Sequence, residues 1–130
     1  MIIRGYSSQI AQIVHPLVVV ADDDPSFRML LRVNLELERY RVLEAASAAE
    51  VRKAMTGPTV GLLLLDVKLG EDNGIELARE LRASQPGLAI AFLTGSALAP
   101  GKGEEIADAF IQKPFDLEEL SATVKRLTRQ

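Results

Sequence analysis

The sequence contains no cysteine, no tryptophan and a single histidine among its 130 residues. The absence of cysteine excludes disulfide bonds and thiolate metal sites. No apolar run approaches the ~20 residues that a membrane-spanning helix needs. The first residues also lack the basic start, apolar middle and cleavage site of a signal peptide. We therefore expect a cytoplasmic protein that makes no use of a membrane.

A large excess of positive charge is also missing. The formal net charge is -3 at pH 7, which argues against general binding to nucleic acid, because such binding needs basic residues to neutralise phosphates. The hydrophobic content of 48% and the charged content of 25% are typical of a globular domain. The length predicts one domain over residues 16–130, preceded by a short N-terminal extension over residues 1–15.

Apolar segments and helix signals alternate along the chain. Five segments predict strands: Leu17–Ala21, Arg41–Glu44, Val60–Leu65, Leu88–Leu93 and Ala109–Ile111. Four stretches predict helices, each after a candidate capping residue (Asp24, Ser47, Asn73 and Asp116): the residues that follow Asp24, then Ala48–Met55, Gly74–Ser84 and Leu117–Leu127. Residues 95–108 include Pro100 and Gly101, so we expect only a short helix there.

This alternation predicts an α/β fold, namely a single-domain, doubly wound, five-stranded parallel sheet with helices on both faces. The continuously apolar strands agree with this, because parallel strands are covered on both faces. In the strand order 2-1-3-4-5, the first and third strands are neighbours and the carboxyl ends of all strands meet at one edge. Ligands of such folds bind at that edge.

Polar residues of matching chemistry follow the predicted strands. Asp22 and Asp23 end the first strand and Asp66 ends the third. Thr94 ends the fourth strand, and Lys113 follows the fifth. Three carboxylates in contact repel one another unless a cation shares the site, and Mg²⁺ suits them because it prefers oxygen ligands. With a lysine and a hydroxyl for phosphoryl oxygens, the set is suited to phosphoryl transfer onto an aspartate.

These five positions, in this order over residues 17–127, resemble the signature of response regulator receiver domains in two-component signalling. The resemblance implies a flavodoxin-like fold with Asp66 as the phosphoacceptor. It implies that Asp23, Asp66 and the backbone carbonyl of Lys68 bind Mg²⁺ directly. Asp22 would act through a bound water.

By the same resemblance, Thr94 and Lys113 hold the phosphoryl oxygens, and Phe110 occupies the position of the switch aromatic. The donor would be a histidine kinase or a histidine phosphotransfer protein. A downstream protein would recognise the changed surface of the fourth helix (the short one expected within residues 95–108), the fifth strand (Ala109–Ile111) and the fifth helix (Leu117–Leu127). The domain would slowly remove its own phosphoryl group without turning over an external substrate, so we do not expect an enzyme in the usual sense. We expect a monomer or a weak dimer.

The first predicted helix has two apolar stripes and an unusual end. Its core-facing positions are Phe27, Leu30, Leu31 and Leu35. Met29, Val33 and Leu37 form a second stripe, and we expect Met29 and Val33 to belong to the surface on which the donor docks. Arg39 stands where the family often has the glycine that ends this helix.

Two other interpretations stay open at this point. The pattern of Asp22, Asp24 and the later Thr94 and Lys113 also resembles haloacid-dehalogenase-like phosphatases, in which Asp22 would be the nucleophile. Against this, the chain is short for that fold, and no acidic pair follows Lys113 at a strand end. Alternatively, the domain binds a partner without accepting phosphate, although its complete set of acidic residues argues against this.

Overall fold

A computed structural model describes residues 16–95, 103 and 105–128 of the chain. Its main sheet has five parallel strands: β1 (Leu17–Ala21), β2 (Arg41–Ala45), β3 (Leu62–Asp66), β6 (Ala89–Thr94) and β7 (Ala109–Gln112). Their spatial order is β2-β1-β3-β6-β7, which confirms the predicted order 2-1-3-4-5. The helices of the described residues are α2 (Pro25–Leu37), α3 (Ala48–Met55), α4 (Gly74–Ser84) and α5 (Leu117–Thr128).

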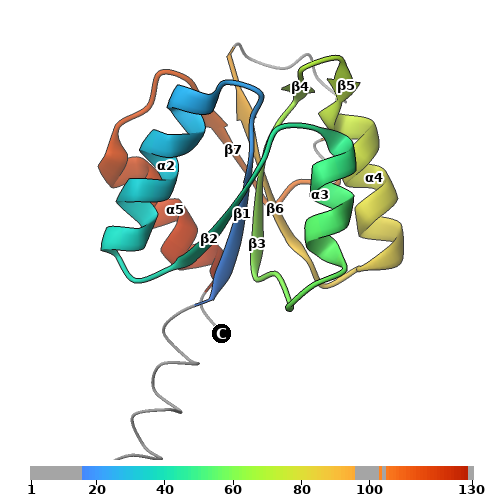
Figure 1. Ribbon diagram of the computed structural model, residues 1–130, viewed down its shortest axis with the longest axis horizontal. Helices are drawn as coiled ribbons and strands as arrows, with labels where there is room; N and C mark the ends of the chain where they lie inside the picture. The colour runs from blue at the N-terminus through green and yellow to red at the C-terminus, as the bar shows by residue number, and fades with distance from the viewer. Residues whose placement is uncertain (1–15, 96–102, 104, 129–130) are drawn as a thin grey trace, which may run out of the picture.

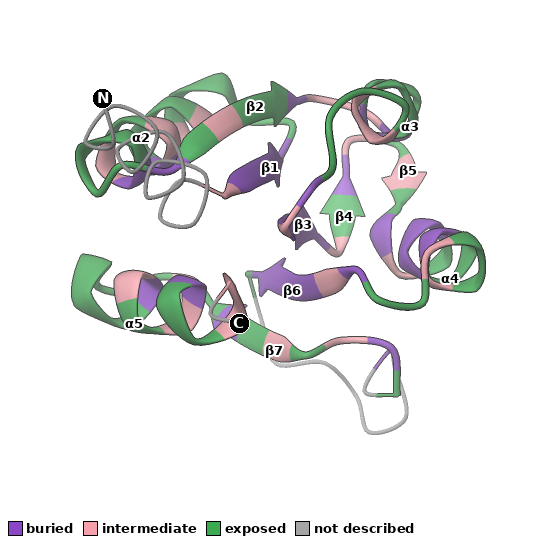
Figure 2. Ribbon diagram, turned by 90° about the horizontal axis from the view of Figure 1, so that it is seen from below, coloured by how far each residue is buried: buried purple, intermediate pink, exposed green. Residues whose placement is uncertain are grey.

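The helices form one layer on each face of the sheet. Helices α2 and α5 lie on one face, and α3 and α4 lie on the other (Figure 1). Seen from below, the same arrangement places the buried strands β1, β3 and β6 between the two helical layers (Figure 2). The doubly wound α/β architecture that the sequence predicts is therefore confirmed.

Strand β3 shows how the apolar runs hold these layers together. Leu62 and Leu64 pack into the hydrophobic cluster beneath α2 and α5, whereas Leu63 and Leu65 pack into the cluster beneath α3 and α4. All four side chains are fully buried, and each contributes roughly 1.5–3 kcal/mol to stability through the hydrophobic effect. A run without alternation is needed because both faces of the strand are covered.

The five predicted strands and the three helices predicted with both ends agree with the observed ones to within two residues at each end, and α2 begins directly after Asp24 as predicted. The sequence does not predict the small hairpin of β4 (Lys68–Leu69) and β5 (Asp72–Asn73), because strands of two residues have no visible periodicity. Leu30, which helical spacing assigns to the core, is 48% exposed. The buried stripe of α2 is therefore narrower than the apolar pattern indicates.

Two expectations fall largely or wholly outside the described residues. These are the N-terminal extension over residues 1–15 and the short helix expected within residues 95–108. The described part of the second stretch, around residues 105–108, forms turns rather than a helix. Among the helices that the structure describes, none combines the length and the apolar character needed to cross a bilayer.

Capping side chains fix where the helices begin, as the sequence predicts. Oδ1 of Asp24 accepts hydrogen bonds from the backbone N–H groups of Ser26 and Phe27, at 3.0 and 3.3 Å. Three further residues accept such bonds at the starts of α3, α4 and α5, namely Ser47, Asn73 and Asp116. A cap of this kind stabilises a helix by about 1 kcal/mol. Asp24 therefore fixes the start of α2 directly after the acidic pair Asp22 and Asp23.

The end of α2 places Arg39 in the left-handed region, with a φ of 75°. The N–H of Arg39 donates to the carbonyl of Glu36 at 2.9 Å, and that of Tyr40 donates to the carbonyl of Leu35 at 3.1 Å. This is the hydrogen-bond pattern of a Schellman motif, and Tyr40 and Leu35 share a hydrophobic cluster, as the motif requires. The left-handed conformation costs a non-glycine residue about 1–2 kcal/mol.

We predict that Arg39→Gly raises the free energy of unfolding by about 1 kcal/mol, because glycine adopts this conformation without steric cost. Urea unfolding followed by circular dichroism measures the change. Lys53→Gly is the matched control, because it also removes a long exposed cationic side chain but lies inside α3. There glycine should lower the free energy of unfolding by about 0.5–1 kcal/mol. Equal losses in both variants would contradict the strain assigned to Arg39.

Candidate functional site

Three carboxylates meet at the carboxyl edge of the sheet. Strands β1 and β3 are parallel neighbours with Ala21 opposite Leu65. Asp22 and Asp23, which follow β1, therefore lie close to Asp66, the last residue of β3. One oxygen from each of Asp22, Asp23 and Asp66 lies within 4.8 Å of the others. Asp22 and Asp66 are only 1% and 8% exposed, whereas Asp23 is exposed. The structure thus brings together the three acidic residues that the sequence singles out.

The ammonium group of Lys113 bridges two of these carboxylates. Its Nζ lies 2.8 Å from Oδ2 of Asp22 and 3.2 Å from Oδ2 of Asp66. The backbone N–H of Lys113 donates to the carbonyl of Thr94 at 2.7 Å, which places the buried Thr94 beside it at the end of β6. The two ion pairs therefore tie the segment after β7 to the ends of β1 and β3.

Burial and charge oppose each other at this edge. Burial, together with the charge of Asp22, raises the pKa of the Asp66 carboxyl above its ordinary value, although the Lys68 N–H and the Lys113 ammonium act to lower it. Burial acts to lower the pKa of Lys113, but the hydrogen bond and charge of Asp22, with the charge of Asp66, raise it above its ordinary value. Among the described residues, the Lys113 ammonium thus contacts two of the three carboxyl groups, and the cluster retains excess negative charge.

This donor set fits a hard divalent cation. Carboxylate oxygens are the ligands that Mg²⁺ prefers, and the three carboxylates are close enough for one ion to contact an oxygen of each. Removal of Asp66 from water disfavours its charged form, and a bound cation would reverse that effect. Asp22, Asp23 and Asp66 are therefore the described residues suited to hold a metal ion.

The backbone after β3 wraps closely around Asp66. The N–H of Lys68 donates to Oδ1 of Asp66 at 2.9 Å, so Lys68 lies directly beside the acidic cluster. The chain then turns at Gly70, which has a φ of 63°, and enters α4 at Gly74. A β-carbon on Gly74 would collide with the carbonyl oxygen of Asp66. Glycine therefore allows α4 to begin against the site.

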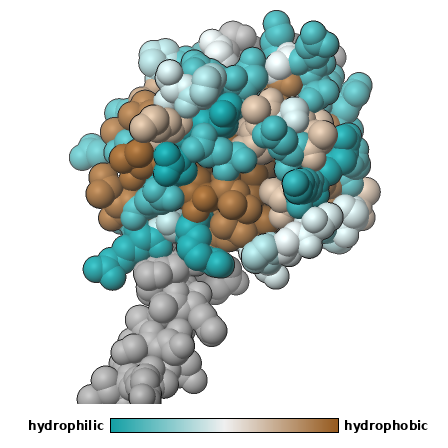
Figure 3. All heavy atoms as spheres, viewed as in Figure 1, coloured by the Kyte–Doolittle hydropathy of each residue, from teal (hydrophilic) through white to brown (hydrophobic). Residues whose placement is uncertain are grey.

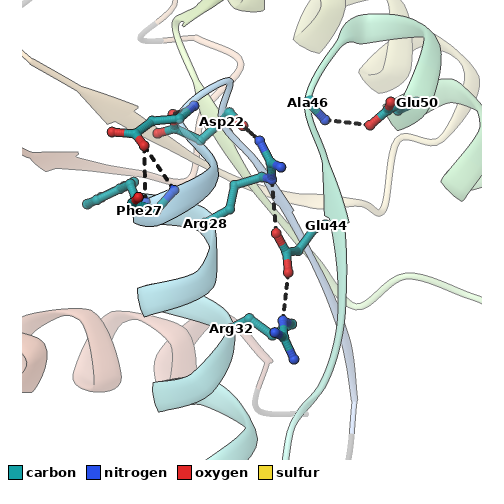
Figure 4. Close-up of polar contacts among 9 residues, drawn as sticks. Asp22, Phe27, Arg28, Arg32, Glu44, Ala46 and Glu50 are labelled. Carbon is teal, nitrogen blue, oxygen red and sulfur yellow. Dashed lines mark hydrogen bonds and ion pairs between the residues drawn. The ribbon is translucent and has the colours of Figure 1, made fainter.

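Arg28, on α2, holds the loop after β1 that contains Asp22 and Asp23. Its Nη1 donates to the carbonyl of Asp22 at 2.7 Å, and its Nε donates to Glu44 on β2 at 3.0 Å. Figure 4 shows Arg28 between Asp22 and Glu44, with Arg32 on the second carboxylate oxygen of Glu44. Oδ1 of Asp22 also accepts from the N–H of Asp24 at 2.9 Å. Both α2 and β2 therefore fix the backbone of the acidic pair.

Phe110, the predicted switch aromatic, lies on β7 opposite Phe92 of β6. The two ring centroids are 5.5 Å apart. Phe92 is fully buried, whereas Phe110 is 40% exposed. The ring thus packs against the core on one side and meets solvent on the other. Its role as a switch stays a prediction.

Several residues near the site escape the sequence analysis. The ring of Phe27 lies 4.2 Å from Nζ of Lys113, although helical spacing assigns Phe27 to the core stripe. Arg28 and Glu44 are 16 residues apart, and no local pattern connects them. Gly74 carries a weak signal, because a glycine directly after a capping asparagine can mark a close approach of two backbones.

Comparison with known proteins gives a consistent result. The family model described as the response regulator receiver domain matches residues 18–125. The aerobic respiration control protein ArcA of Escherichia coli K12 is 36% identical over 115 residues, which cover 86% of this chain and 48% of ArcA. The TorCAD operon transcriptional regulatory protein TorR of the same strain is 34% identical over 119 residues, covering 85% of this chain and 49% of TorR. The chain thus spans about half the length of the curated relatives it matches.

A solved structure agrees with these relatives. The response regulator protein TrrA of Thermotoga maritima, in complex with Mg²⁺ and BeF, has a TM-score of 0.80 to this chain at 29% identity. The match covers 86% of this chain and 98% of the TrrA chain. The fold described above therefore extends over almost all of that molecule.

We predict that Asp66→Asn stabilises the metal-free protein at neutral pH. Because the pKa of Asp66 is raised in the folded state, the folded protein loses stability as pH rises from the ordinary value of 3.8 through the folded pKa. Asparagine has the same shape and removes this loss. Urea unfolding in EDTA, at pH values from about 3 to about 7, should show that the advantage of the variant grows with pH. An advantage that is constant across this range would contradict the cost assigned to the buried charge.

Proposed function

Because the chain belongs to the response regulator receiver family, we propose that it accepts a phosphoryl group on the carboxylate of Asp66. The observation that carries this proposal is the setting of Asp66. It is a buried carboxylate at a strand end, with Asp22 and Asp23 beside it and the Lys113 ammonium 3.2 Å away. Phosphoryl transfer needs a positioned nucleophile and positive charge for the phosphoryl oxygens, and this setting supplies both.

Mg²⁺ is the cation that we assign to the acidic cluster. Its proposed ligands are Asp23, Asp66 and the backbone carbonyl of Lys68, with Asp22 acting through a water molecule. Two observations support this assignment: the donors are all oxygens, and the relative TrrA was solved in complex with Mg²⁺ and BeF. When bound, Mg²⁺ neutralises phosphate oxygens, so that an anionic carboxylate can approach phosphorus.

The proposed transfer exchanges one bond to phosphorus for another. A carboxylate oxygen of Asp66 forms a P–O bond while the P–N bond of a phosphohistidine breaks, and the leaving imidazole keeps the electron pair. Lys113 supplies positive charge to one phosphoryl oxygen, and the hydroxyl of Thr94 donates to another. Water later attacks phosphorus, the P–O bond to Asp66 breaks, and inorganic phosphate leaves as the Asp66 carboxylate is regenerated. The domain is thus an acceptor that turns over no external substrate.

Phosphorylation would bias a two-state equilibrium. The phosphoryl group carries roughly -1.5 to -2 charge in place of the single charge of the carboxylate, and its oxygens draw Thr94 and Lys113 toward Asp66. Phe110 then turns inward, and a downstream partner reads the changed face around β7 and α5. The identity of that partner, the monomeric or weakly dimeric state and the cytoplasmic location stay predictions.

The donor in this proposal is a histidine kinase or a histidine phosphotransfer protein that docks on α2. Met29, Val33 and Leu37 lie on successive turns of this helix and are 55%, 40% and 77% exposed. Figure 3 shows hydrophobic residues on the side of the molecule where Figure 1 places α2. An apolar stripe of this kind gains about 25 cal/mol for each Å² that a partner removes from water.

We predict that incubation with acetyl phosphate and Mg²⁺ adds one phosphoryl group to the wild-type protein, measured as intact mass. Peptide mapping should place the group on Asp66, and Asp66→Asn should carry none. Asp22→Asn should retain the acceptor but react at least tenfold more slowly, because the cation loses an outer ligand and Lys113 loses its closest partner.

The other outcomes separate the alternative interpretations. A phosphoryl group mapped to Asp22 would support the phosphatase-like chemistry in place of the receiver chemistry. No adduct, together with no binding of beryllofluoride, would indicate a module that binds a partner without accepting phosphate. An adduct that persists in Asp66→Asn would overturn the assignment of the acceptor.

We predict that Met29→Asp and Val33→Asp slow transfer from a phosphorylated histidine protein by about tenfold or more, because each buries a charge in an apolar interface. The rate with acetyl phosphate should not change, because this small donor needs no docking surface. Leu43→Asp on β2 is the matched control for Val33→Asp, because each wild-type side chain is 40% exposed. Equal slowing by Leu43→Asp would argue against α2 as the docking surface.

A further inference from the structure

Phe27 packs against the core cluster beneath α2 and also lies against the proposed reaction centre. It sits in the first turn of α2, shortly after the acidic pair. The Nζ atom of Lys113 lies over its ring, 4.2 Å from the ring centroid. Phe115, two residues after Lys113, packs edge to face against Phe27, with centroids 5.8 Å apart and planes at 75°. Phe27 therefore contacts both Lys113 and Phe115, which are distant from it in the sequence.

The surroundings of the ammonium group explain what the ring does. An ammonium has three N–H donors and no acceptor. Asp22 and Asp66 take two directions from Nζ, at 2.8 and 3.2 Å. The face of Phe27 takes another, and the π electrons of that face attract a cation. Since the Lys113 side chain is only 26% exposed, the ring occupies space that water would otherwise fill.

We propose that Phe27 is a positioning residue whose ring face seats the ammonium of Lys113 within reach of Asp66. The proposal rests on the proposed function, in which Lys113 contacts a phosphoryl oxygen. The two carboxylates around Nζ change during that reaction, because one gains the phosphoryl group and both neighbour the cation. The Phe27 ring, unlike the two carboxylates, has the same charge distribution and chemistry throughout the reaction.

The ring itself is held from two sides. The backbone N–H of Phe27 donates to Oδ1 of Asp24 at 3.3 Å, so the helix cap fixes where the side chain begins. Phe115 then restricts the tilt of the ring through the edge-to-face contact. An aliphatic side chain would fill much of the same volume but would offer no negative π face to Lys113. This difference between filling space and attracting charge makes the proposal testable.

The test compares Phe27→Leu, which removes the π face, with Phe27→Tyr, which keeps it. The rate of Asp66 phosphorylation by acetyl phosphate and Mg²⁺ should fall about two- to fivefold in Phe27→Leu, the size expected for a partly exposed cation–π contact. Phe27→Tyr should react at nearly the wild-type rate. Acetyl phosphate is used so that no docking surface on α2 contributes to the result.

A second readout needs neither metal nor phosphate. In the metal-free protein, the ε-methylene protons of Lys113 should show an upfield ring-current shift by NMR. The shift should vanish in Phe27→Leu and remain in Phe27→Tyr. If wild type accepts no phosphoryl group, the proposed function fails, and this readout still decides whether the ring seats the lysine. An unshifted methylene in wild type would overturn the proposal.

A double-mutant cycle distinguishes the contact between the Phe27 ring and the Lys113 ammonium from ordinary packing by Phe27. In a Lys113→Ala background, Phe27→Leu should cause no further slowing of phosphorylation, because the ring then has no ammonium to hold. Equal slowing in both backgrounds would show that Phe27 acts by another route and would overturn the proposal. Unchanged rates in Phe27→Leu would do the same. Urea unfolding of each variant confirms that the rates are measured on folded protein.

Discussion

The carboxyl edge of the sheet must hold three carboxyl groups beside the ammonium of Lys113, and the surrounding elements are arranged around that electrostatic constraint. Lys113 reaches Asp22 and Asp66 only because β7, β1 and β3 are parallel and end at the same edge. Arg28 is attached to the same edge through the carbonyl of Asp22, so a second cation supports the acidic loop without neutralising its carboxylates. The remaining negative charge is what makes the edge receptive to a divalent cation.

This arrangement costs stability, and the fold offsets the cost elsewhere. Desolvation opposes the charged form of Asp66, and a protein that needed only stability would replace the cluster with apolar groups. The site instead rests on strands β1 and β3, whose side chains are buried on both faces and stabilise the fold through the hydrophobic effect. The charged edge therefore lies at the ends of two fully buried strands, whose packing opposes the repulsion between its charges.

The limits of the sequence analysis follow from the range over which each signal acts. Asp66 and Thr94 could be found because each directly ends an apolar run, and the parallel topology then brings the strand ends together. The capping role of Asp24 could be found because a cap acts over three residues. The contact between Phe27 and Lys113 could not be found, because it joins two segments through packing angles that no local pattern encodes. Arg39 shows the opposite case, in which the geometry of a motif is kept although its usual glycine is absent.

Helix α2 combines two functions that its periodicity keeps apart. Its first turn, which Asp24 caps, places the Phe27 ring beside Lys113. Met29 and Val33 instead belong to the exposed stripe. Residues two positions apart on a helix lie on different faces, so a protein that covers the stripe need not touch the ring. It would still press on the same rigid element that holds Phe27 beside Lys113. In the proposed function, a donor docked there would be placed in a fixed relation to the Lys113 ammonium, and α2 would link recognition of the donor to the chemistry proposed for Asp66.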